Sequence, residues 1–194
     1  MSGTLNRWSG PASLVAGVLW LLIWLHQRAT HGLTATNEMR LLFGLTWMDS
    51  AKFLVAPPLL LLMGVVSLYQ RRERPGWLGR VGGIVTGVGL GFLSLGIAIE
   101  FWPFPWGSYA VIFEEAALPQ VGGLIQALSS LVFTFGLIVF NIDLVRAKVM
   151  PVWAAPVLIL GGLTTFFLTP VSWLPGLAWL LLWVVLWLRK DPAY

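Results

Sequence analysis

Two groups of side chains in this sequence could carry chemistry, and the first group is ionisable. It comprises a histidine and three glutamates near the ends of apolar runs or in an aromatic-rich segment: His26, Glu100, Glu114 and Glu115. Carboxylates beside aromatic rings can hold a cation or an amine, and an ionisable residue in a membrane span is a candidate ion, proton or ligand contact. The alternative for each is a boundary position that reaches water. We treat all four as candidate ligand or ion contacts.

The second group is a polar stripe along one predicted helix. Gln126, Ser130, Thr134 and Asn141 fall within about 80° of one another when each residue turns the helix by about 100°. Lipid offers polar side chains no partners, so the stripe must face protein or a wet cavity. One interpretation is hydrogen bonding between helices, and the other is a substrate path. A proton relay is not favoured, because no ionisable residue lies at mid-membrane depth on this face.

Several kinds of catalysis and metal binding lack the residues that they need. The chain has no cysteine, which excludes disulfides, thiol nucleophiles and thiolate-bound metals. Its two histidines, His26 and His31, are five residues apart, and no metalloprotease, nucleophile-elbow or phosphate-loop motif is present. We therefore predict no metal site, no cofactor and no assigned catalytic residue.

Composition identifies the environment of these side chains. The chain has 194 residues, of which 58% are hydrophobic and 10% charged, and its mean hydropathy is +0.83. A soluble domain carries about 25% charged residues, so this chain is expected to lie in a membrane. The net charge of +4 does not indicate nucleic-acid binding, because the basic residues lie between hydrophobic runs. The predicted partners are the lipid bilayer and other membrane-protein subunits.

Six apolar segments approach the roughly 20 residues that a helix needs to cross the hydrocarbon. They cover residues 9–27, 50–69, 80–101, 121–145, 151–169 and 172–188. The alternating ten-residue strands of a membrane barrel are absent from the sequence. We predict an all-α integral membrane protein, a six-transmembrane-helix bundle with cytoplasmic N- and C-termini, formed by a single domain over residues 1–194.

The distribution of basic residues gives this orientation. Nine of the twelve lie at the N-terminus, in the second and fourth connections and at the C-terminus: Arg7, Arg71, Arg72, Arg74, Arg80, Arg146, Lys148, Arg189 and Lys190. The opposite side has Arg28, Arg40 and Lys52. Cytoplasmic loops are enriched in Lys and Arg, and the predicted location is the bacterial cytoplasmic membrane. Five of the eight acids lie on the outer side, so any chemistry is expected to open outward.

The strongest motif is structural, because the third predicted span carries two glycine faces. Gly79, Gly83, Gly87 and Gly91 recur every four residues, and Gly82, Gly89 and Gly96 recur every seven. The two sets point in different directions around the helix. Small residues allow helices to approach closely in lipid. This helix is therefore predicted to be central and to contact neighbours on two sides.

Prolines and helix caps give further local predictions. Pro57-Pro58 and Pro156 are expected to kink or break the second and fifth spans. Asp49 or Ser50 is expected to cap the second span. Residues 37–43 are expected to begin a short helix on the membrane surface.

Ala12 and Ala16 stand four residues apart in the first span. Together with the chain length, the six spans and the long first outer connection, this spacing resembles the substrate-binding subunits of vitamin-uptake ECF transporters. In that family, an Ala-xxx-Ala pattern in the first helix docks on the partner subunit. The resemblance implies a six-helix fold with an outward-facing substrate site.

Three functions follow from these observations. The first is a small multi-pass protein acting as a non-catalytic scaffold or accessory subunit of a membrane complex, favoured because few polar residues remain to form a site. The second is a substrate-binding or transport protein of the ECF type, using the outer acids and the polar stripe. The third is an intramembrane enzyme that uses His26 with Glu100.

Overall fold

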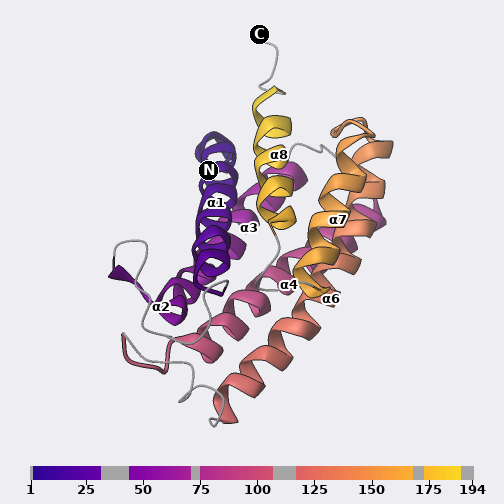
Figure 1. Cartoon of the computed structure of the whole chain (residues 1–194). Helices are drawn as coiled ribbons and strands as arrows, with labels where there is room; N and C mark the ends of the chain where they lie inside the picture. The colour runs from indigo at the N-terminus through magenta and orange to yellow at the C-terminus, as the bar shows by residue number, and fades with distance from the viewer. Residues whose placement is uncertain (1, 32–43, 71–74, 107–116, 168–172, 189–194) are drawn as a thin grey trace.

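The computed structural model describes residues 2–31, 44–70, 75–106, 117–167 and 173–188, and all regular structure in these ranges is helical (Figure 1). The elements are α1 (Ser2–His31), α2 (Trp47–Lys52), the 3-10 helix η2 (Phe53–Val55), α3 (Ala56–Gln70), α4 (Trp77–Phe101), α6 (Ala117–Arg146), α7 (Ala154–Phe167) and α8 (Leu174–Leu188). The predicted all-α class is confirmed for the described residues.

Four apolar helical segments are long enough to cross a bilayer. They are Trp8–Ala29, Met48–Gln70, Trp77–Phe101 and Pro119–Arg146, which correspond to the first four predicted spans. The helices α7 and α8 are also apolar but have only 14 and 15 residues, fewer than the roughly 20 of a typical crossing. These lengths and compositions fit a multi-pass helical membrane protein, and the six-span count stays a prediction.

The prolines that were expected to kink or break two spans lie in the first turns of α3 and α7. The segment changes from α2 to η2 before α3 begins at Ala56, which puts Pro57 and Pro58 in the first turn of α3. Pro156 likewise lies in the first turn of α7, which begins at Ala154. Backbone N–H groups in a first turn have no intrahelical acceptor, so proline costs little there. The prediction that Pro156 kinks or breaks the fifth span is therefore wrong.

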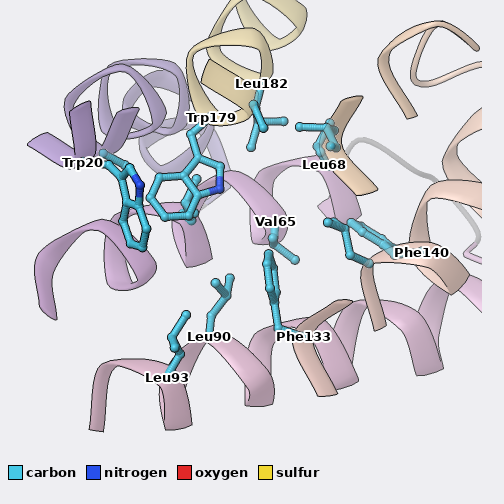
Figure 2. Close-up of a cluster of buried hydrophobic side chains, with 14 of the residues drawn as sticks. Trp20, Val65, Leu68, Leu90, Leu93, Phe133, Phe140, Trp179 and Leu182 are labelled. Atoms are coloured by element: carbon cyan, nitrogen blue, oxygen red, sulfur yellow. The ribbon is translucent and has the colours of Figure 1, made fainter. Parts of the chain in front are cut away.

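The six longer helices form a closed arrangement that we call the helix ring. In order around it, α1 packs against α3, α3 against α4, α4 against α6, α6 against α7, α7 against α8, and α8 against α1 (Figure 1). Apolar side chains, including Val65 and Phe133, fill the interior (Figure 2). Trp20 and Trp179 meet there edge to face, with ring centroids 4.8 Å apart. The start of α1 and the end of α8 lie at the same end of the bundle (Figure 1).

The helices α4 and α6 are antiparallel and pack backbone to backbone at one register. A Cβ added to Gly82 would lie 2.5 Å from the backbone nitrogen of Phe140, and a Cβ on Gly89 would lie 2.5 Å from that of Phe133. The same closeness of backbones joins Gly96 to Gln126, Gly122 to Glu100 and Gly136 to Thr86, whereas Gly79 lies against the side-chain carboxylate of Asp143. In each pair the two residue numbers add up to 222, so one register holds along both helices. A side chain at these glycines would force the helices apart, which is why the pair needs them.

The remaining glycines of α4 lie on other sides of the helix. A Cβ on Gly83 would lie 3.1 Å from Cδ2 of Tyr69, and one on Gly87 would lie 3.2 Å from Cδ1 of Leu62, both on α3. Nothing lies within 4 Å of a Cβ placed on Gly91. The helix α4 therefore contacts α6 through one set of glycines and α3 through Gly83 and Gly87, while Gly91 makes no close contact.

We expect Gly89→Ala to lower the free energy of unfolding by about 1–3 kcal/mol, because its methyl group would meet the backbone of Phe133. The matched control is Gly91→Ala on the same helix. Its methyl group enters open space, so the higher helix propensity of alanine makes it neutral or up to about 1 kcal/mol more stable. Thermal unfolding in detergent measures both. Equal melting temperatures for the two variants would contradict the register.

Candidate functional site

Glu100 and Gln126 meet at one end of the α4–α6 pair. The side-chain amide of Gln126 donates a hydrogen bond to Oε2 of Glu100. The backbone of Glu100 lies against Gly122, where an added Cβ would be 2.6 Å from the Glu100 nitrogen. Two of the candidate ligand contacts are thus brought together. They form a polar contact between two helices, with the carboxylate only partly buried.

A buried lysine joins the start of the second span to residues 102–106, which we call the aromatic segment after α4. Nζ of Lys52 lies 3.3 Å from Oδ1 of Asp49 and donates a hydrogen bond of 2.9 Å to the carbonyl oxygen of Phe104. It also lies 4.3 Å from the centroid of the Trp106 ring, within the range of a cation–π interaction. The indole of Trp102 donates to the carbonyl oxygen of Lys52 over 3.2 Å. The aromatic segment therefore already holds a cation, which the chain itself supplies.

Lys52 is not among the candidate functional residues that the sequence predicts. Its signal was the spacing of Asp49 and Lys52, since residues three apart on a helix are neighbours. The side chain of Lys52 is only 2% exposed. A lysine is almost never buried to this degree without a partner. Asp49, three residues before Lys52, is that partner.

Thr46 caps this helix, and the prediction of Asp49 or Ser50 as the cap is wrong. The hydroxyl oxygen of Thr46 accepts a hydrogen bond of 3.2 Å from the backbone nitrogen of Asp49. The backbone nitrogen of Thr46 in turn donates to Oδ2 of Asp49 over 3.2 Å. This reciprocal pair is a capping box. Asp49 therefore has two roles, in the cap and in the ion pair with Lys52.

Three members of the polar stripe of α6 are buried and have no hydrogen-bond partner in the described chain, whereas Gln126 is partly buried. The three are Ser130, Thr134 and Asn141, of which Asn141 is 1% exposed. Other buried hydroxyls bond to the carbonyl oxygen four residues back: Thr86 to Gly82 over 2.6 Å and Thr165 to Gly161 over 2.8 Å. The hydroxyls of Ser130 and Thr134 thus lack the bond to the preceding helical turn that buried serine and threonine can make.

A small cavity lies inside the helix ring beside Asn141. Its volume is about 20 Å³, and five helices line it through residues that include Leu61, Leu90, Phe133, Leu158 and Trp179. Asn141 is the one residue with a side-chain amide among this mostly apolar set of described lining residues. Of the four stripe residues, only Asn141 lines the cavity.

The remaining candidates are separate from this cavity. His26 is buried in α1. Within the described residues, Glu100 bonds to Gln126, and no hydrogen bond or ion pair joins it to His26. Glu114 and Glu115 lie outside the described residues. The part of the chain that the structure describes contains no group of three or more His, Cys, Asp or Glu side chains that could hold a metal ion.

Comparisons with protein-family models, with curated proteins and with solved structures give no match.

We expect Lys52→Met to lower the free energy of unfolding by about 3–5 kcal/mol. The substitution removes the ammonium group that pairs with the buried carboxylate of Asp49, together with the contacts to Phe104 and Trp106. Arg80→Met, at an exposed basic position of α4, is the control and should change stability little. Chemical or thermal unfolding in detergent provides the measurement. A Lys52→Met protein as stable as the control would show that the ion pair is not structural.

Proposed function

We propose that this protein is a small multi-pass membrane protein that acts as a non-catalytic scaffold or accessory subunit of a membrane complex. The observation that carries the proposal is the filled interior of the helix ring. Trp20 and Trp179 pack against each other there, and the cavity beside them measures about 20 Å³. Pockets for small organic ligands measure about 300–1,000 Å³. In the described part of the chain, this cavity has too little room for a transported solute.

The polar groups at the outer end support the same role. Glu100 is bonded to Gln126, and Lys52 is bonded to Asp49 and to the carbonyl oxygen of Phe104. These groups satisfy one another across helices and connections. Such contacts hold a bundle together, because a buried polar group is costly unless it is hydrogen-bonded.

The outward face of the α4–α6 pair supports contact with lipid or with helices of another subunit. Large apolar side chains are exposed along both helices: Ile84, Val88, Phe92, Leu95, Leu124, Leu128, Leu131 and Phe135. A soluble monomer rarely exposes a continuous apolar surface of this kind. In a bilayer, lipid tails or the apolar helices of another subunit can contact the same surface.

A second candidate function is substrate binding at an outward-facing site, and Glu100 favours it. An ionisable residue within an apolar span is costly and often functional. Glu100 belongs to the segment Trp77–Phe101 and is only partly buried. This alternative agrees with the resemblance to ECF-type substrate-binding subunits.

We also propose that the chain crosses the membrane six times with both termini in the cytoplasm. The arrangement in Figure 1 supports this topology, because the start of α1 and the end of α8 lie at the same end. The chain has no cysteine, so single-cysteine variants can be labelled without background. Trp173, between α7 and α8, is the informative position.

A membrane-impermeant maleimide should label Trp173→Cys and Trp106→Cys from the outside of intact cells, because both positions are exposed at the outer end in this topology. Lys148→Cys, between α6 and α7, should be labelled only after permeabilisation. Labelling of Trp173→Cys only after permeabilisation would show that α7 and α8 do not cross the membrane.

The proposed role is tested by mild extraction and native mass spectrometry. We expect the protein to be retained with a partner subunit at fixed stoichiometry. Glu100→Gln should leave that stoichiometry unchanged, because the amide keeps the size of the side chain and can still accept from Gln126. A bound small molecule in the native protein that is lost in Glu100→Gln would favour substrate binding instead. A protein that runs alone, with no partner, would contradict the scaffold role.

A further inference from the structure

Asn141 is a buried amide that its neighbours leave unsatisfied. Its side chain is 1% exposed, and neither Nδ2 nor Oδ1 has a hydrogen-bond partner in the described chain. An asparagine amide supplies two donors and an acceptor. Buried polar groups in folded proteins almost always have a protein or water partner. The position of Asn141 therefore requires a partner that is not one of the described side chains.

The cavity beside Asn141 sets the size of that partner. It measures about 20 Å³, and one water molecule needs roughly 10–15 Å³ on this measure. Organic ligands occupy far larger pockets. The volume therefore selects one water molecule over a substrate or a lipid headgroup.

Trp179 supplies a second polar group at the same cavity. Trp179 lines the cavity together with Asn141. Figure 2 shows the nitrogen of Trp179 on the ring edge turned away from Trp20 and toward Val65, which is another lining residue. An indole N–H is a donor only, so a water oxygen can accept from it. Empty cavities in proteins are apolar, whereas the lining of this one includes Asn141 and Trp179, which both carry polar groups.

We propose that the cavity is a binding site for a single buried water molecule held by Asn141 and Trp179. The water donates to Oδ1 of Asn141 and accepts from the indole N–H, which gives it the two to four partners that buried waters have. It links α6 to α8, which are not neighbours in the helix ring. The site does not depend on the proposed scaffold role.

Thr134 provides a matched control on the same helix. Its hydroxyl is also buried without a partner, but Thr134 does not line the cavity. It lies against α7 instead, where a Cβ on Gly162 would be 3.2 Å from Oγ1 of Thr134. Thr134→Val removes an unpaired hydroxyl, whereas Asn141→Val removes an amide together with its water. Valine has about the same helix propensity as threonine and asparagine.

The two variants should therefore shift the melting temperature of the full chain in opposite directions. Thr134→Val should raise it by about 2–4 °C, because an unsatisfied polar group is lost. Asn141→Val should lower it by about 2–4 °C, because the hydrogen bonds to the water are lost and the cavity becomes dry. An increase for Asn141→Val equal to that of Thr134→Val would overturn the proposal, since it would show that the amide has no partner to lose.

Direct observation of the site completes the test. An experimental structure at a resolution that shows ordered waters should contain one water within hydrogen-bonding distance of Asn141, and none at that place in Asn141→Val. Under xenon pressure, the native cavity should exclude the gas and the Asn141→Val cavity should bind it, because xenon enters dry apolar cavities. Xenon in the native cavity, or density larger than a water molecule, would overturn the assignment.

Discussion

The structure depends on the close approach of α4 and α6. In lipid there is no hydrophobic force to bring helices together, so association relies on packing. Glycines make this packing possible because each removes a side chain opposite a larger residue, as at Gly82–Phe140 and Gly89–Phe133. Both helices supply glycines, since Gly122 and Gly136 of α6 receive Glu100 and Thr86 of α4. The other helices complete the ring around this pair, with α3 on one side and α7 on the other.

The sequence was sufficient to predict the long helices and the two-sided packing of α4, because apolar length and glycine spacing are local signals. Glycine spacing alone does not show which neighbouring helix each glycine contacts. Gly79 and Gly83 are four residues apart, yet Gly79 meets Asp143 of α6 and Gly83 lies nearest to Tyr69 of α3. Helix ends were also difficult to predict. The assignment of the cap to Thr46 depends on hydrogen-bond geometry in the capping box, and Pro156 is tolerated because the helix begins at Ala154.

The candidate site could also be predicted only in part, because local spacing is visible in the sequence and contacts between helices are not. The 3.6-residue period was enough to collect Gln126, Ser130, Thr134 and Asn141 on one face, and the structure buries the last three. Which of them bonds to another helix is decided by packing, because only Gln126 has Glu100 within reach. From its own residues, the aromatic segment after α4 is a candidate place for an external cation or amine, or a boundary segment that reaches water. The amine beside it comes from Lys52, about fifty positions earlier in the chain, and a contact of that range is not visible in local spacing.

The fixed register of α4 and α6 has a consequence for motion. Moving one helix along the other by one turn, about 5.4 Å, would put Thr86 opposite Phe133 or Phe140 instead of Gly136. Phenylalanine could not fit opposite Thr86 where the two backbones touch. Sliding is therefore blocked in both directions. Any rearrangement of the ring must carry these two helices together as one rigid body, with displacement confined to the contacts made by α1, α3, α7 and α8.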